Sequence, residues 1–132
     1  MRNNLLSEIS LLVLTLGLLT VSCSNADSSY QCPCSQIGID SAWADSSDVL
    51  CYKIPVNQIY GNNKSGKVYI AAILAKKTGI SSDEPLLYLH GGPGIATLDN
   101  AERYVNSSNW KELREKHDLI MFDYRGTGFS EP

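Results

Sequence analysis

Two short segments are apolar at every position, 86–89 (Leu-Leu-Tyr-Leu) and 119–122 (Leu-Ile-Met-Phe). Uniformly apolar strands are typical of parallel sheets in which both faces are covered. The stretch between the segments has the length that a parallel crossover requires, and the right-handed crossover rule makes the two strands parallel. We therefore predict two parallel strands that are buried on both faces.

The stretch between the two strands contains a predicted helix. Asn109 is a suitable N-cap residue, and Glu112 completes a capping box three residues later. Trp110, Leu113 and Arg114 would then form the inner face of this helix.

An antiparallel hairpin is predicted ahead of the parallel strands. Residues 51–56 alternate enough to form a strand, and Pro55 places it at a sheet edge because proline cannot donate to a ladder. Turn residues fill 62–66, and 67–75 is rich in β-branched and aromatic residues in its first half, as a returning strand would be. Residues 36–49 show neither the helical nor the strand period of apolar positions, so we expect a surface segment that leads into the domain and packs through Trp43.

The first residues have the pattern of a secretory signal. The apolar run 9–21 is too short to span a bilayer comfortably, and Arg2 precedes it. The segment 19–23 (Leu-Thr-Val-Ser-Cys) resembles a bacterial lipobox, in which Cys23 would carry the lipid. The alternative is ordinary signal-peptidase cleavage after Ala26.

These patterns predict a division of the chain into three parts. A signal peptide occupies 1–22, a lipid-anchor tether and cysteine-rich lead-in occupies 23–35, and the folded unit covers 36–132. The expected location is the periplasmic side of a bacterial membrane, with the lipid anchor as the membrane contact. The net charge of −3 leaves no basic stripe for phosphates, so nucleic acid is not an expected partner.

Three cysteines, Cys32, Cys34 and Cys51, follow the lipobox, and an oxidising compartment favours a disulfide among them. A bond between Cys32 and Cys34 would close a strained small ring around Pro33. Cys51 is therefore expected to pair with one of the two, and the sequence leaves open which. The rival interpretation is a zinc site, but no histidine or fourth cysteine stands at ligand spacing, so no metal is expected.

A glycine-rich turn follows each uniformly apolar segment, 90–94 (His-Gly-Gly-Pro-Gly) and 123–130 (Asp-Tyr-Arg-Gly-Thr-Gly-Phe-Ser). In open α/β sheets, ligands bind at the carboxyl ends of the strands. Acyl transfer builds a negative oxygen that must meet fixed backbone donors, and glycines let the main chain approach closely. The turn 90–94 suits that task, although its glycines could also merely reverse the chain.

With these two motifs in this order, the chain resembles the α/β-hydrolase branch that contains proline iminopeptidases and tripeptidyl aminopeptidases. Segment 51–56 is also similar to the strand with which the domain of the secreted tripeptidyl-aminopeptidase-like members begins. The resemblance implies the amino-terminal part of an α/β-hydrolase sheet, without a cofactor, in which Gly91 and Gly92 supply half of an oxyanion hole. Structural roles are implied for His90, Pro93, Gly94, Asp123, Arg125, Gly126, Gly128 and Ser130.

Finer expectations attach to the second turn. Asp123 and Arg125 would pair with each other or bond the turn's backbone, and Ser130 would cap a following helix. Gly128-Phe129-Ser130 begins like the nucleophile motif G-x-S-x-G, but Pro132 stands where the last glycine should be. Ser130 is therefore not expected to be a nucleophile.

In the family, the nucleophile, the acid and the catalytic histidine all lie downstream of the second turn. The 132 residues are thus expected to lack the triad, to be inactive alone, and to be part of an exported serine peptidase that releases amino-terminal residues from a peptide substrate. Two alternatives remain open. One is a non-catalytic lipoprotein that keeps the first half of the fold, and the other is an esterase of the same fold.

Overall fold

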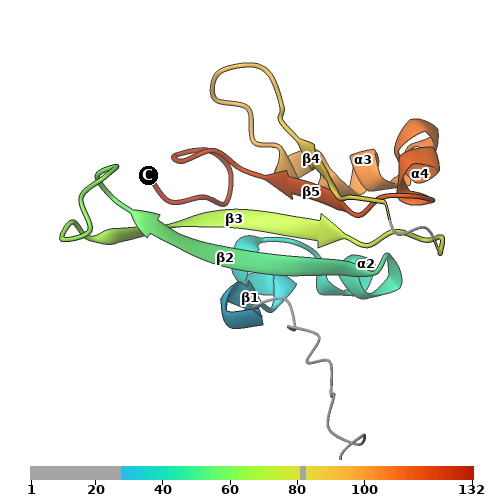
Figure 1. Cartoon of the computed structure of the whole chain (residues 1–132), viewed down its shortest axis with the longest axis horizontal. Helices are drawn as coiled ribbons and strands as arrows, with labels where there is room; N and C mark the ends of the chain where they lie inside the picture. Colours follow the sequence, from blue (N-terminus) through green and yellow to red (C-terminus); the bar gives the residue numbers. More distant parts are fainter. Residues whose placement is uncertain (1–27, 81–82) are drawn as a thin grey trace, which may run out of the picture.

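The computed structural model describes residues 28–80 and 83–132, which form a five-stranded mixed sheet with short helices (Figure 1). The strands are β1 (Gln31–Cys32), β2 (Val49–Asn57), β3 (Lys67–Ala75), β4 (Leu86–Tyr88) and β5 (Leu119–Phe122). The α-helices are α2 (Ser41–Ser46), α3 (Ala101–Asn106) and α4 (Ser108–Arg114), and the 3-10 turns are η1 (Ser28–Tyr30), η2 (Cys34–Ile37) and η3 (Leu98–Asn100). The predicted α/β class is confirmed, and the sheet is consistent with part of an α/β-hydrolase fold.

The strand order is β1-β2-β3-β5-β4. β2 and β3 pair antiparallel over their whole length, from Val49 opposite Ala75 to Asn57 opposite Lys67. β4 and β5 pair in parallel, with Leu87 beside Ile120. The predicted hairpin and the predicted parallel pair are therefore both present. The antiparallel contact between β3 and β5, which joins them into one sheet, was not predicted.

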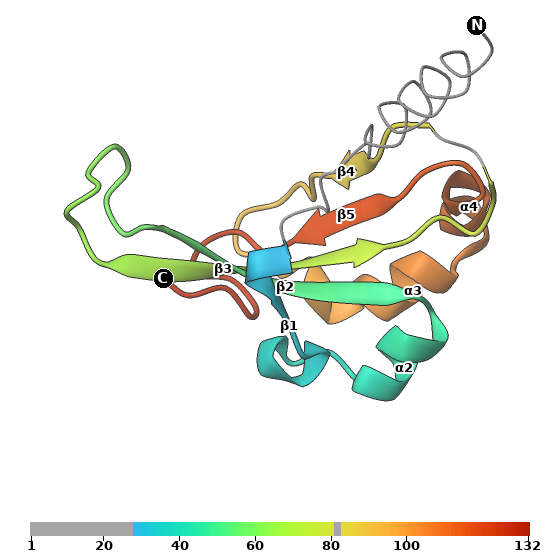
Figure 2. The ribbon, with the colours of Figure 1, turned by 60° about the horizontal axis from the view of Figure 1, so that its bottom comes forward.

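The core lies on one face of the sheet. Cys51, Ile73 and Met121 stand side by side in register on β2, β3 and β5, and each is buried. Ala44 of α2 and Val105 of α3 belong to the same buried cluster. The short helices therefore gather on this side of the sheet (Figure 2).

The prediction that 86–89 is buried on both faces is wrong. Leu87 is 55% exposed, and Leu89, which lies beyond the end of β4, is 60% exposed. β4 is the outermost strand, and Leu87 and Ile120 point away from the face that the helices cover. A uniformly apolar strand is buried on both faces only where both are covered, and the described helices cover one.

The predicted helix divides into two. Ser107 is extended between α3 and α4 and is the N-cap of α4, so Asn109 lies inside a helix instead of capping one. Trp110 packs on the core and Arg114 is buried, but Leu113 is 41% exposed. Trp110 and Arg114 are four residues apart and share one side of this short helix, whereas Leu113 lies at its margin.

The lead-in is more regular than its sequence indicated. Residues 36–49 contain η2 and α2, and the Oδ1 atom of Asp40 caps α2 by accepting from the N–H of Trp43 at 2.7 Å. Trp43 packs against the core, as expected. A helix of this length carries too little periodicity to be recognised, but its N-cap aspartate was visible in the sequence.

The membrane-directed expectations fall on residues that are not described, since the signal segment and Cys23 lie before residue 28. Among residues 28–80 and 83–132, no helix combines the length and the apolar character needed to cross a bilayer.

Arg114 joins the end of β3 to the exit of α2. Its Nε and Nη2 atoms donate to the carbonyl of Lys76 at 3.0 and 2.6 Å, and Nη2 also donates to the carbonyl of Ser47 at 2.9 Å. Burial lowers the pKa of Arg114, and the nearby Asp48 and Asp118 oppose that shift.

We expect Arg114→Met to lower the free energy of unfolding by about 2–4 kcal/mol, because two carbonyls lose a charged donor while the apolar stem is kept. Urea titration measures this loss. Lys111→Met, at an exposed position on the same helix α4, is the matched control and should change the free energy by less than about 0.5 kcal/mol. Equal losses in the two variants would contradict the role given to Arg114.

Candidate active-site turns

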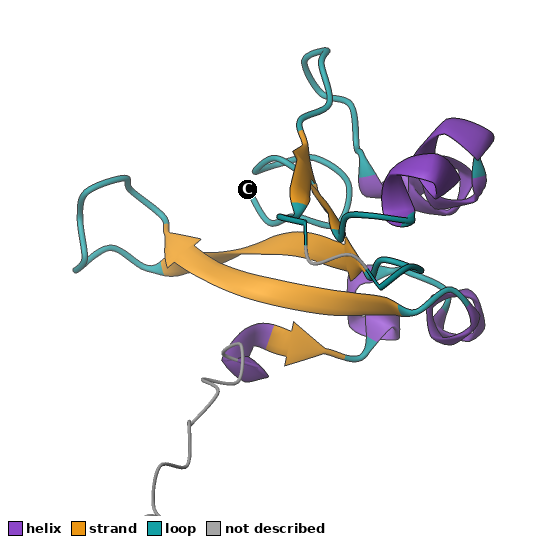
Figure 3. Cartoon of the chain, turned by 45° about the vertical axis from the view of Figure 1, so that its right-hand side comes forward, coloured by secondary structure: helices purple, strands orange, loops and turns teal. Residues whose placement is uncertain are grey.

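The two glycine-rich turns lie at one end of the parallel pair. β4 and β5 run in the same direction (Figure 2), so the residues that follow them leave the sheet at the same end of the strands, where they form loops (Figure 3). The hydroxyl of Tyr124 in the second turn donates to the carbonyl of His90 in the first at 3.4 Å. The turns are therefore neighbours in space, although about thirty residues separate them in the chain.

The first turn bends at its glycines. Gly92 has φ 105° and Gly94 has φ 77°, values that glycine adopts without steric cost. A Cβ atom at Gly92 would lie 2.7 Å from the Cδ1 atom of Ile95, the end of an exposed side chain that can move aside, so the positive φ is what disfavours a side chain there. Within residues 28–80 and 83–132, the N–H groups of Gly91 and Gly92 have no hydrogen-bond acceptor, and both glycines are exposed. Successive unpaired amides at a strand end are suited to bind an anionic oxygen.

His90 orders the first turn. Its Nδ1 atom contacts the carbonyl oxygen of Gly91, and its Nε2 atom lies 3.1 Å from the hydroxyl of Tyr104 on α3. Tyr88 packs edge-on against Tyr104 and Trp110, with ring centroids 5.4 and 4.8 Å apart. Because both nitrogens of His90 have partners, the histidine fixes the turn against the helices. Tyr104 was not recognised from the sequence, since only the fold brings it to His90.

Asp123 fixes the second turn from inside. Its side chain is fully buried, with Oδ1 accepting from the N–H of Leu98 and Oδ2 accepting from the N–H of Phe129, each at 2.9 Å. Of the two expectations for Asp123, the carboxylate thus bonds the backbone and does not pair with Arg125. The guanidinium of Arg125 instead donates to the carbonyl of Gln58 at 2.9 Å, beside the hairpin turn.

Ser130 is buried and its hydroxyl has two partners. The Oγ atom donates to the carbonyl of Asp123 at 2.8 Å and accepts from the N–H of Ala71 on β3 at 2.9 Å. This differs from the expected helix cap, because the hydroxyl joins the second turn to the central strand. A hydroxyl engaged in this way is not positioned as an attacking nucleophile.

The glycines of the second turn have different surroundings. Gly126 has φ 70° and Gly128 has φ 48°. A Cβ atom at Gly126 would meet nothing closer than 3.9 Å, whereas one at Gly128 would lie 2.2 Å from the Oδ2 atom of Asp123 and 2.7 Å from the Cβ atom of Ala96. Gly128 is therefore required by the close approach of the turn to Asp123.

The three cysteines of the described residues lie around β1 and β2, at the other end of the strand order from β4. Cys34 and Cys51 form a disulfide, and Cys32 is a free, half-buried thiol. Cys51 thus pairs with one of its two expected partners and leaves the other over.

The mixed sheet with its helices is consistent with part of an α/β-hydrolase fold. No family model matches the chain. The chain is similar to a probable proline iminopeptidase of Leptolyngbya boryana, at 33% identity over 72 residues, which cover 52% of this chain and 20% of that protein. It is also similar to a tripeptidyl aminopeptidase of Streptomyces lividans, at 29% identity over 93 residues, which cover 68% of this chain and 17% of that protein.

The chain therefore spans about a fifth of the length of the curated relatives that it matches. Both relatives are named as peptidases, and both are of the α/β-hydrolase type. The sequence identity is low, but together with the fold this similarity supports a peptidase-like family for the chain.

Proposed function

We propose that the chain supplies the first part of the sheet and one side of the oxyanion hole of an exported serine peptidase that releases residues from the amino termini of peptides. The unpaired N–H groups of Gly91 and Gly92, at the end of β4 and beside the second turn, carry this proposal. The names of the two similar proteins support the substrate class.

The chemistry requires donors that are already in place. When a nucleophile attacks a peptide carbonyl, the carbonyl oxygen becomes negative, and fixed N–H groups stabilise that charge. One donor would come from the first turn and another from the residue that follows the nucleophile. On this proposal, the nucleophile, the acid and the catalytic histidine come from sequence outside these 132 residues.

A serine-directed fluorophosphonate probe tests the proposal. We expect no labelling of the 132-residue chain, and labelling of a longer product of the same gene together with release of an amino-terminal residue from peptide amides. Labelling of the 132-residue chain itself at Ser130 would contradict the assignment. A longer product that is neither labelled nor active would instead favour the non-catalytic lipoprotein.

The Gly92→Ala variant of that longer product should lose about 10²- to 10³-fold in kcat, because a side chain at this bend displaces the adjacent donors. Gly61→Ala is the matched control, since Gly61 also has a positive φ of 76° but lies in the hairpin turn with nothing within 4 Å of the added Cβ. Steady-state kinetics on a peptide amide measure both variants. Similar losses of kcat would show that the bend at Gly92 has no special part in the reaction.

Export and lipid anchoring at Cys23 form a second part of the proposal, supported by the apolar run 9–21 and the lipobox-like segment 19–23. Mass spectrometry of the mature amino terminus should find a diacylated Cys23, and Cys23→Ser should abolish the acyl mass. A free amino terminus at Asp27 would contradict the anchor and support ordinary signal-peptidase cleavage.

A further inference from the structure

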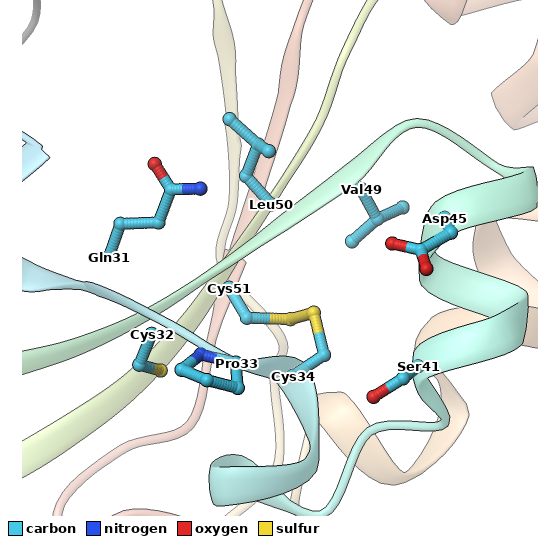
Figure 4. A pocket seen from close by; sticks show the side chains of 9 residues that line it. All are labelled: Gln31, Cys32, Pro33, Cys34, Ser41, Asp45, Val49, Leu50 and Cys51. Carbon is cyan, nitrogen blue, oxygen red and sulfur yellow. A yellow bond between two sulfur atoms is a disulfide. The ribbon is translucent and has the colours of Figure 1, made fainter.

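The three cysteines form one cluster at the start of the sheet. Cys32 on β1 is the direct partner of Cys51 on β2 in the antiparallel register, while the disulfide of Cys51 goes to Cys34. Figure 4 shows all three on the wall of one pocket, with the disulfide between Cys34 and Cys51 and the thiol of Cys32 beside Pro33. A free thiol therefore stands directly across the strand pair from half of an existing disulfide.

The register meets the spatial requirement of a second disulfide. Residues that lie opposite each other in an antiparallel pair project to the same face, with Cα atoms about 4.5–5.5 Å apart. Disulfides form between Cα atoms about 4.4–6.8 Å apart, and the bond between Cys34 and Cys51 spans 5.1 Å. The Cα spacing typical of this register thus lies within the range that allows Cys32 to bond Cys51 in place of Cys34.

We propose that Cys51 is shared by two exchanging disulfides, one to Cys34 and one to Cys32. The thiolate of Cys32 attacks the Sγ atom of Cys51, the bond from Cys51 to Cys34 breaks, and Cys34 leaves as a thiolate. One sulfur–sulfur bond forms as the other breaks. The proton that Cys32 loses to solvent is matched by the proton that Cys34 takes up, so no oxidant or reductant is consumed.

The surroundings permit the exchange in both directions. The pocket beside the cluster has a volume of about 600 Å³, which gives the sulfur atoms room to change partners. The carbonyl of Cys34 accepts from the N–H of Ile39 at 3.1 Å, a contact that does not depend on the disulfide. Cys34 therefore stays near Cys51 after it is released, and the reverse attack is available.

Charged and ionisable groups around the cluster set the rate of exchange. Burial raises the pKa of the Cys32 thiol, and Lys53 on β2 opposes part of that shift. Asp45 of α2 lines the same pocket, and Tyr52 lies next to Cys51 on β2. The attacking thiolate is consequently scarce at neutral pH, and exchange accelerates as the pH rises toward the pKa of Cys32.

Disulfide mapping tests the proposal on the oxidised 132-residue chain. The chain is incubated at about pH 8.5, near the ordinary thiol pKa, and free thiols are then alkylated with N-ethylmaleimide. Chymotrypsin cleaves after Tyr30 and so separates Cys23 from the cluster, and fragmentation at the bond before Pro33 distinguishes an adduct on Cys32 from one on Cys34.

The adduct should appear on Cys34 in a fraction that rises with incubation time to a constant level and does not depend on protein concentration. An adduct confined to Cys32 at every time would overturn the proposal. Because the measurement reads thiols and not hydrolysis, its outcome is independent of the peptidase assignment.

Two variants sharpen the test. Cys34→Ser should form the bond between Cys32 and Cys51 in a glutathione redox buffer, which leaves neither thiol open to alkylation. Two alkylated thiols in this variant would also overturn the proposal. Cys32→Ser is the matched control, and its Cys34 should remain unmodified throughout the incubation.

Discussion

Replacement of Asp123 by alanine should lower the free energy of unfolding by about 3–6 kcal/mol, the largest effect that we expect from one substitution. The buried carboxylate accepts from the N–H groups of Leu98 and Phe129, and its removal leaves both donors without an acceptor. Asp123→Asn keeps one accepting oxygen and should lose roughly half as much. Urea titration measures the three proteins.

Asp99 provides the control for Asp123, since its side chain is exposed on η3. Asp99→Ala should change the free energy of unfolding by less than about 0.5 kcal/mol. A loss of under about 1 kcal/mol for Asp123→Ala would mean that water replaces the carboxylate at no cost, and the role given to this residue would then be wrong.

The second large effect is expected at Gly128, where alanine should cost about 2–5 kcal/mol. A positive φ costs a residue with a side chain about 1–2 kcal/mol, and the clash with Asp123 and Ala96 adds the cost of overpacking. Gly126→Ala has the same conformational cost without the clash, so it should lose only about 1–2 kcal/mol. Thermal unfolding of the two variants separates these contributions, and equal melting temperatures would contradict the steric argument.

The sequence predicted those elements whose signals are local. The segment 67–75 was bounded correctly by its β-branched content, and the glycine-rich turns were located because each follows a short apolar segment. Pro55 was assigned to an edge, and in the structure it lies beyond the short pairing with β1, so that β3 is its only neighbour among the described strands.

Features that depend on tertiary contacts were not predicted. The pairing of β3 with β5 depends on where the crossover places β5, which no local pattern encodes. Leu87 has an apolar side chain of the kind that is usually buried, but it lies on the outermost strand and is exposed. Arg114 was expected on the inner face of a helix, but its carbonyl partners at Ser47 and Lys76 are distant in the chain.

The candidate site was predicted in outline. Gly91 and Gly92 were singled out for the close approach of the main chain, and Gly126 and Gly128 for structural roles in the second turn. Gly92, Gly126 and Gly128 have a positive φ, which glycine adopts readily. The side chains that hold the turns in place were harder to foresee. Asp123 reaches Leu98 and Tyr124 reaches His90 only because β4 and β5 are adjacent, so a pattern along the chain does not reveal these pairs.

The hydrogen bond from Leu98 to Asp123 has a consequence for the first turn. The loop that contains Gly91 and Gly92 leaves from β4 and is held again at Leu98, only a few residues later, by a carboxylate inside the protein. A loop held at both ends has few shapes to choose from, so little conformational entropy remains to be lost when an anion arrives. The affinity of this bend for an anion should accordingly depend on the strength of the contacts between them, and hardly at all on a rearrangement of the loop upon binding.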